Sequence, residues 1–293
     1  MKSCISTYSF ERLYQDGGFT RFNAIDKTKE YGCQGVELVL NDETPDGSTP
    51  MEYAKALCAH AKEQGLEVPI YTTGANFFVK EPEKELERLC RHIDIAAECK
   101  IPLLRHDVAW GYYEGYTGIR SYKKVIEAVA PFVRQAAEYA RERGVKTCSE
   151  NHGYLLQDSA RMLFAAVDHP NYGFLCDMGN FTVVDEDCAT AVSALSDHIV
   201  HVHAKDMLVR SGMNFDPGRG YNLSRGGNYW RGTIFGHGNV PTFQILSAIR
   251  KSGYDGYVSL EFEGMEPVLE GVEIGTQNLQ HMIEVIGEGQ RYV

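Results

Sequence analysis

The chain has 293 residues, 43% hydrophobic and 24% charged, which is ordinary globular composition and enough length to bury one large core. A formal net charge of −11 argues against duplex nucleic acid as a partner, since phosphate binding needs a basic face, and favours a small polar substrate. The N-terminal MKSCISTYSF lacks the apolar run of a signal peptide, and no later segment approaches the ~18–20 apolar residues of a spanning helix, so we expect a cytoplasmic protein without a membrane partner.

Short β-rich runs alternate along the chain with longer segments of helical period. The clearest helical segment is 121–143, where apolar residues recur at spacings of three and four. Gly65, Gly144 and Gly253 each stand just past a helical segment, where glycine commonly ends a helix. We predict strands at 3–9, 35–40, 67–73, 101–106, 145–150, 172–177, 198–204 and 256–262.

These eight predicted strands with helical crossovers indicate a parallel sheet covered by helices. Eight such units close naturally into a single (β/α)8 TIM barrel, which we expect to span residues 1–293. A doubly wound sheet fits less well, because no GxGxxG turn follows the first strand. In a barrel the active site forms at the C-terminal ends of the strands, so the residues there are the candidates for function.

Acidic residues and histidines occupy several of these strand ends. Burying an unpaired carboxylate costs several kcal/mol of folding free energy, or the group becomes protonated. The convergence of several carboxylates at one point therefore indicates a bound cation. Three carboxylates and one imidazole form a mostly hard ligand set that suits Mn²⁺, Mg²⁺ or Co²⁺ and tolerates Zn²⁺. The predicted ligands are Glu150, Asp177, His203 and Glu261, with Glu263 as the alternative to Glu261, since the two side chains point the same way.

The stretch HVHAKD, residues 201–206, contributes more than the ligand His203. His201 shares the face of His203 one layer deeper, so we expect it to support the site structurally. Lys205 is also in register and is a candidate for neutralising a substrate oxyanion; the alternative is that it only pairs with Asp206 or Glu263.

Further candidates for substrate binding lie near other strand ends. Glu37 is predicted to hydrogen-bond a metal ligand or a sugar hydroxyl, with a buried structural ion pair as the alternative. His106 and Trp110, after the fourth strand, are candidates for the wall of a sugar site, and Asn180 for a hydrogen bond to a hydroxyl.

Five strings of residues, in order over nearly the whole chain, resemble the sugar phosphate isomerase/epimerase family of xylose isomerase-like barrels. They are SENHG at 149–153, CDMGN at 176–180, HVHAKD at 201–206, FGHGNVP at 235–241 and GYDGYVSLEFEG at 253–264. The resemblance implies a divalent metal, often manganese, on the four ligands above. In the ketose epimerases of this group two glutamates move a proton through an enediolate, and Glu150 and Glu261 match their positions.

We therefore expect a metal-dependent sugar isomerase or epimerase acting on a ketose or keto-sugar derivative. One alternative is a lyase on the same scaffold, an inosose-type dehydratase or an enzyme cleaving a 3-keto-glycoside, with His152 as the base. Another is a non-catalytic, sugar-binding partner subunit. Asn180 stands where several epimerases and the related abasic-site endonucleases place a histidine, which argues against the trinuclear zinc nucleases.

The segment 207–240 is long, rich in glycine and basic. A connection of that length is usually functional or disordered, and its aromatic residues favour order. We predict a lid over the sugar, from which an arginine such as Arg231 reaches a phosphate, a glycone or a neighbouring subunit. The alternative is that its arginines are solvated or bind a partner protomer of a homo-oligomer.

Overall fold

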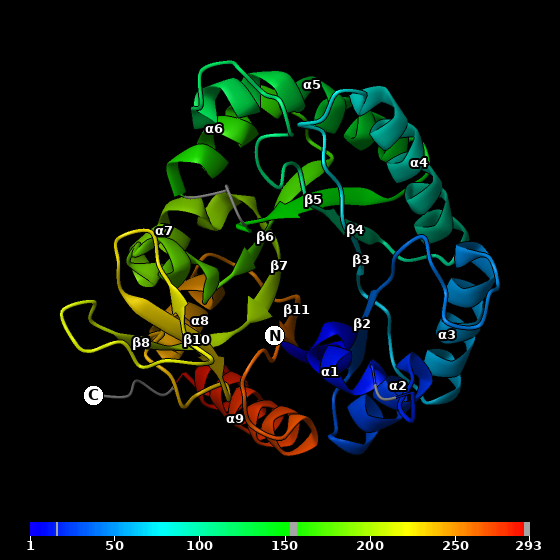
Figure 1. The fold of residues 1–293 in the computed structure, drawn as a ribbon. Helices are drawn as coiled ribbons and strands as arrows, with labels where there is room; N and C mark the ends of the chain where they lie inside the picture. Colours follow the sequence, from blue (N-terminus) through cyan, green and yellow to red (C-terminus); the bar gives the residue numbers. More distant parts are fainter. Residues whose placement is uncertain (16, 153–156, 290–293) are drawn as a thin grey trace. The chain divides into compact units, whose positions relative to one another are not determined.

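The structure is a computed structural model, and it describes residues 1–15, 17–152 and 157–289. Eight strands form a closed barrel in the order β1-β11-β7-β6-β5-β4-β3-β2, which confirms the predicted TIM barrel (Figure 1). The strands are β1 (Lys2–Ser6), β2 (Gly35–Val39), β3 (Tyr71–Thr73), β4 (Leu103–His106), β5 (Lys146–Glu150), β6 (Tyr172–Asp177), β7 (Ile199–Ala204) and β11 (Tyr257–Leu260).

Helices connect successive strands, as the sequence period predicts. Gly65, Gly144 and Gly253 have φ of 71°, 72° and 100°, the left-handed conformation that glycine adopts at helix ends. The helices are α1 (Glu11–Tyr14), α2 (Arg21–Glu30), α3 (Pro50–Glu63), α4 (Pro82–Glu98), α5 (Tyr122–Arg141), α6 (Gln157–Val167), α7 (Cys188–Leu195), α8 (Thr242–Lys251) and α9 (Val268–Gly287), with short 3-10 turns η1 (Thr7–Phe10), η2 (Asn180–Val184) and η3 (Ser196–His198). None of the helices within the described residues is long and apolar enough to cross a membrane.

The chain divides into two compact units. Unit 1 comprises 1–37, 60–67 and 176–293, and unit 2 comprises 38–59 and 68–175. In unit 1, β1 pairs with β2 and with β11, and β11 pairs with β7; in unit 2, pairing runs from β2 through β3, β4 and β5 to β6. Two of the boundaries between the units fall inside a strand, at 37/38 in β2 and at 175/176 in β6.

The long segment after β7 contains a second, antiparallel sheet that the sequence analysis did not predict. Its strands β8 (Asp206–Arg210), β10 (Tyr229–Thr233) and β9 (Asn222–Leu223) are paired in that order. Asp185, a non-glycine residue with φ of 61°, fastens the β9–β10 turn to the end of η2. Its carboxylate accepts hydrogen bonds from Ser224 Oγ at 2.9 Å, Gly226 N at 2.5 Å and Asn228 Nδ2 at 2.7 Å.

Replacing Asp185 by alanine is expected to release this turn, because three hydrogen bonds onto one carboxylate are lost. Limited trypsin digestion should then cut faster after Arg219 or Arg225, with little change in the melting temperature. The matched control is Asp187→Ala, which removes the N-cap of α7 and should cost about 1 kcal/mol of stability without exposing the turn. Equal cleavage rates in the wild type and Asp185→Ala would contradict this account.

Candidate functional site

Three side chains from neighbouring strands meet in unit 1. Asp177 ends β6, His203 lies on β7 and Glu261 follows β11, and each is at least nine-tenths buried. Each offers a ligand atom, and these atoms lie within 4.8 Å of one another. His203 Nδ1 is 3.5 Å from Glu261 Oε2 and 3.9 Å from Asp177 Oδ2. This part of the sequence-predicted ligand set therefore converges.

Glu37, on β2, fixes the imidazole of His203 from behind. The two oxygens of this fully buried carboxylate lie 3.1 and 3.0 Å from His203 Nε2. With Nε2–H donating to Glu37, Nδ1 is the nitrogen that faces Asp177 and Glu261. A carboxylate behind a histidine in this way orients the ring and raises its basicity toward a metal.

Burial and charge act in opposite directions on this pair. Burial disfavours the ionised form of Glu37, but the imidazoles of His203 and His201 outweigh it and hold the pKa of that carboxyl well below its usual range. Burial likewise opposes protonation of His203, and Glu37 and Glu261 together raise its pKa well above the usual range. Glu37 thus forms the buried ion pair that the sequence left as one alternative.

His201 lies beside the same carboxylate, as expected of a supporting residue. Its Nε2 is 3.5 Å from Glu37 Oε2 and 2.8 Å from the hydroxyl of Ser259 on β11. Both His201 and Ser259 are buried, so they complete the polar layer beneath His203.

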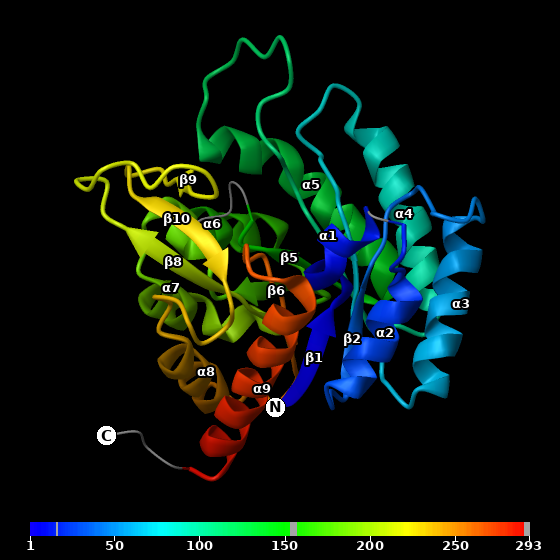
Figure 2. The same ribbon diagram turned by 60° about the horizontal axis from the view of Figure 1, so that its bottom comes forward.

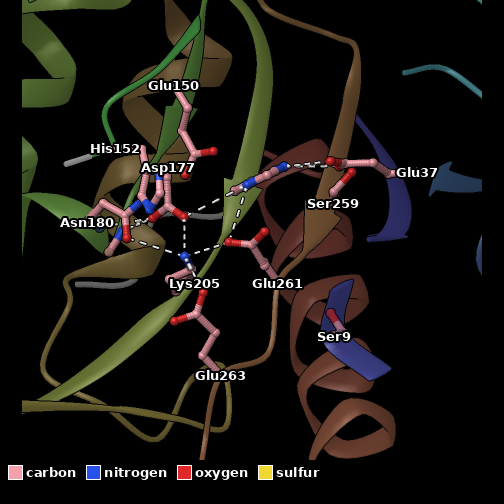
Figure 3. A network of polar contacts seen from close by, with 12 residues as sticks. Ser9, Glu37, Glu150, His152, Asp177, Asn180, Lys205, Ser259, Glu261 and Glu263 are labelled. Atoms are coloured by element: carbon pink, nitrogen blue, oxygen red, sulfur yellow. Dashed lines mark hydrogen bonds and ion pairs between the residues drawn. The ribbon is translucent and has the colours of Figure 1, made fainter. Parts of the chain in front are cut away.

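Lys205 carries the positive charge of the centre. Its Nζ lies 3.0 Å from Asp177 Oδ2, 2.5 Å from Glu261 Oε2, 3.0 Å from Glu263 Oε1 and 3.3 Å from Asn180 Oδ1 (Figure 3). Burial would raise the pKa of Glu261, but Lys205 and His203 hold it well below the usual range. The predicted pairing with Glu263 is present, and the ammonium also bridges two of the candidate ligands.

The sequence left Asp206 or Glu263 as the partner of Lys205, and the structure has Glu263. Asp206 leaves the strand on the opposite face, because successive side chains alternate. Asp206 instead accepts backbone hydrogen bonds from Met207, Gly236, Gly238 and Val240, at 2.8, 3.0, 2.8 and 3.2 Å. This carboxylate organises the segment that leads from β10 into α8.

The donor set of unit 1 fits a divalent cation. Asp177, Glu261 and Glu263 bring carboxylates to one ammonium, that of Lys205, while His203 is engaged with Glu37. An excess of carboxylate oxygens, those of Asp177 and Glu261 buried, beside an imidazole nitrogen is the chemistry that hard and borderline divalent ions select. This buried cluster of acidic residues and histidine could bind a divalent metal.

Unit 2 contains a second row of charged side chains, after β4 and β5. Arg105 Nη2 lies 2.6 Å from Glu150 Oε2 and 2.9 Å from Asp107 Oδ1, and His152 Nδ1 is 3.1 Å from the same Asp107 oxygen. Burial opposes ionisation of Asp107, but Arg105 and His152 lower its pKa to about 2. The hydrogen bond that His152 donates to Asp107 in turn raises the pKa of His152, whose side chain is 55% exposed.

Arg105 and Asp107 were not among the predicted site residues. The signal that points to them is strand alternation: on β4, Arg105 pairs in register with Cys148 of β5, which puts Arg105 and Glu150 on one face. The same alternation turns His106 to the opposite face. There it is fully buried, its Nδ1 lies 2.7 Å from the Asp107 carbonyl oxygen, and its ring packs against Phe77 and Tyr172.

His106 therefore belongs to the packed layer outside the strands and does not form a sugar wall. Trp110, the other predicted wall residue, is 63% exposed. Asn180 lies at the centre, where its amide oxygen meets Lys205. Arg231 pairs with Glu266 at 3.2 Å.

A family model described as "Xylose isomerase-like TIM barrel" matches residues 25–286. The chain belongs to this family. Among solved structures, it is similar to a D-tagatose 3-epimerase-like protein, with TM-score 0.72, 18% identity and 99% of each chain covered. The probable 3-DHS dehydratase AsbF of Bacillus anthracis matches with TM-score 0.72 and 18% identity, over 96% of this chain and 99% of that one. A family protein of Mycobacterium smegmatis in complex with magnesium matches with TM-score 0.67 and 16% identity, over 92% and 90%.

Similarity to these structures, at such low identity, shows the fold alone. Curated relatives include inosose dehydratases. That of Lacticaseibacillus casei is 29% identical over 142 residues, 47% of each chain. That of Lactiplantibacillus plantarum is 29% identical over 157 residues, 50% of this chain and 51% of the relative. The chain thus spans about half the length of the curated relatives it matches.

Replacing Lys205 by methionine is expected to destabilise the metal-free protein by about 3–5 kcal/mol, because buried carboxylates lose their cation. Urea unfolding in EDTA measures this. The control is Lys55→Met, which removes an exposed pair with Glu98 and should change stability far less. Equal losses in the two variants would contradict the central position given to Lys205.

Proposed function

We propose that the chain is a divalent-metal-dependent isomerase or epimerase that moves a proton next to the carbonyl group of a keto-sugar. The observation that carries the proposal is the imidazole of His203, held by Glu37 through Nε2 with Nδ1 directed at Asp177 and Glu261. Family membership and the sugar epimerases among proteins of the same fold support it.

Glu150 is proposed as the fourth ligand. On the sheet it pairs in register with Leu175 of β6, and Asp177 follows two residues later on that strand. Glu150 and Asp177 therefore end neighbouring strands. The resulting set, Glu150, Asp177, His203 and Glu261, is three carboxylates and one imidazole, for which Mn²⁺ or Mg²⁺ is the proposed ion.

When bound, such an ion acts as a Lewis acid that stabilises negative charge on the carbonyl oxygen as the neighbouring proton leaves. Glu150 and Glu261 are the proposed proton carriers, one on each side of the sugar, so that removal on one side and return on the other inverts a carbon centre. Positioned acid–base groups of this kind typically contribute about 10²–10⁴-fold in rate. Lys205 and Asn180 are proposed to hold substrate oxygens beside them.

A dehydratase is the second candidate, and the Asp107–His152 pair favours it. The half-exposed imidazole of His152, two residues beyond Glu150, is positioned by a buried carboxylate, as a general base is. The partial similarity to inosose dehydratases points the same way. In that reaction the same proton abstraction next to a carbonyl is followed by loss of water.

Replacing Glu37 by glutamine is expected to weaken Mn²⁺ binding about 10–100-fold, because the partner that orients His203 loses its charge. Isothermal titration calorimetry measures the affinity, and circular dichroism checks the fold. Glu67→Gln, an exposed carboxylate of unit 1, is the control and should bind Mn²⁺ like the wild type. An Mn²⁺ affinity of Glu37→Gln equal to that of the wild type would contradict the proposal.

Incubation in D₂O with Mn²⁺ and a panel of ketoses and inososes separates the two candidates. An epimer or aldose that carries one solvent deuterium indicates an isomerase or epimerase, and a product lighter by one water indicates a dehydratase. For a dehydratase, His152→Ala should lower the rate by about 10²–10⁴-fold. If no sugar takes up deuterium and none loses water, the result counts against both the epimerase and the dehydratase.

A further inference from the structure

A groove of about 1080 Å³ opens in unit 2, apart from the Arg105–Glu150 row. It is lined by the segments that follow β2, β3 and β4 and by the first half of α4. The long loops after β3 and β4 rise at the top of Figure 2. The volume lies just above the roughly 300–1,000 Å³ typical of small-molecule sites, which is more than one sugar ring needs.

Trp110 forms an exposed aromatic wall of this groove. Its side chain is 63% exposed, and its indole also packs against the backbone: a Cβ added at Gly74 would lie only 2.9 Å from Trp110 Cζ2. The backbone N–H of Trp110 donates to Asn76 Oδ1 at 3.4 Å. Glycine at residue 74 is what lets the indole approach the backbone so closely. A tryptophan that packs against the backbone and keeps an open surface suits stacking against a ring of a ligand.

The charged side chains of the groove neutralise one another. Arg88 bridges Asp42 at 3.1 Å and Glu85 at 2.8 Å, and Lys84 pairs with Glu81 at 2.6 Å. The lining has five acidic and four basic residues, so it presents little net charge to a ligand. This disfavours a phosphate or a metal ion and favours a neutral ligand rich in hydrogen-bonding groups.

We propose that this groove binds a sugar ring stacked on Trp110, so that the substrate is a keto-sugar carrying a second ring, a glycoside or disaccharide. The inference rests on the proposed function for its reacting ring. Asp107 connects the two regions. Its carboxylate positions His152, and a Cβ added at Gly74 would lie 3.9 Å from its Oδ2 as well as 2.9 Å from Trp110 Cζ2. One ring would thus be processed beside His152 and Glu150 while Trp110 holds the other.

The chain has two tryptophans, Trp110 and Trp230, so a Trp230→Phe variant reports on Trp110 alone. Its fluorescence is titrated in EDTA, without metal, with cellobiose, maltose, lactose and methyl β-glucoside, and with glucose for comparison. At least one disaccharide should cause a saturable change in emission, at a concentration about tenfold lower than glucose requires. No change with any of these sugars, or equal affinity for glucose and every disaccharide, overturns the proposal.

Calorimetry with the Trp110→Ala variant tests whether the disaccharide binds at Trp110. This exposed substitution should leave the circular dichroism spectrum and Mn²⁺ affinity unchanged and weaken binding of the same disaccharide at least tenfold. Undiminished binding would overturn the proposal. The binding experiments require no turnover, so they test the groove separately from the reaction. If no disaccharide binds but deuterium exchange is normal, the groove proposal fails and the proposed function stands. If a disaccharide binds but no exchange occurs, the proposed function fails and the groove proposal stands.

Discussion

The contact between Glu37 and His203 is the interaction on which the rest of unit 1 depends. In the sheet β1 and β11 lie between β2 and β7, so this ion pair joins two strands that are not neighbours. Taking two charges out of water is costly, and the cost is offset only where geometry and further hydrogen bonds are good. His201 and Ser259 supply that surrounding layer. The result is an imidazole with one nitrogen already engaged and the other turned to two carboxylates.

Strand alternation explains which neighbouring residues take part and which do not. On β4 it separates Arg105, which meets Glu150, from His106, which packs against aromatic rings. After β7 it separates Lys205, which meets the carboxylates of the centre, from Asp206, which binds four backbone amides. Polar residues that are adjacent in the sequence therefore contact different partners on opposite faces of the strand.

Periodicity predicted the barrel and the place of each strand, because each strand reads as a short apolar run bounded by turns. Strand order also brought Asp177, His203 and Glu261 together, since parallel strands end at one edge. The sequence left the partners of Glu37 and Lys205 as alternatives, because the partner of a charged side chain depends on which residues the tertiary structure places beside it. The groove beside Trp110 depends on a close approach to Gly74 that no local pattern reveals.

The central claim is that the buried carboxylates and His203 form one site for a divalent ion. Equilibrium dialysis of the metal-free protein against Mn²⁺, with the bound ion counted by atomic absorption, tests it most directly. The account predicts one tightly held ion per chain in the wild type and its loss in Asp177→Asn. No bound ion in the wild type, or the same amount bound by the variant, would contradict it.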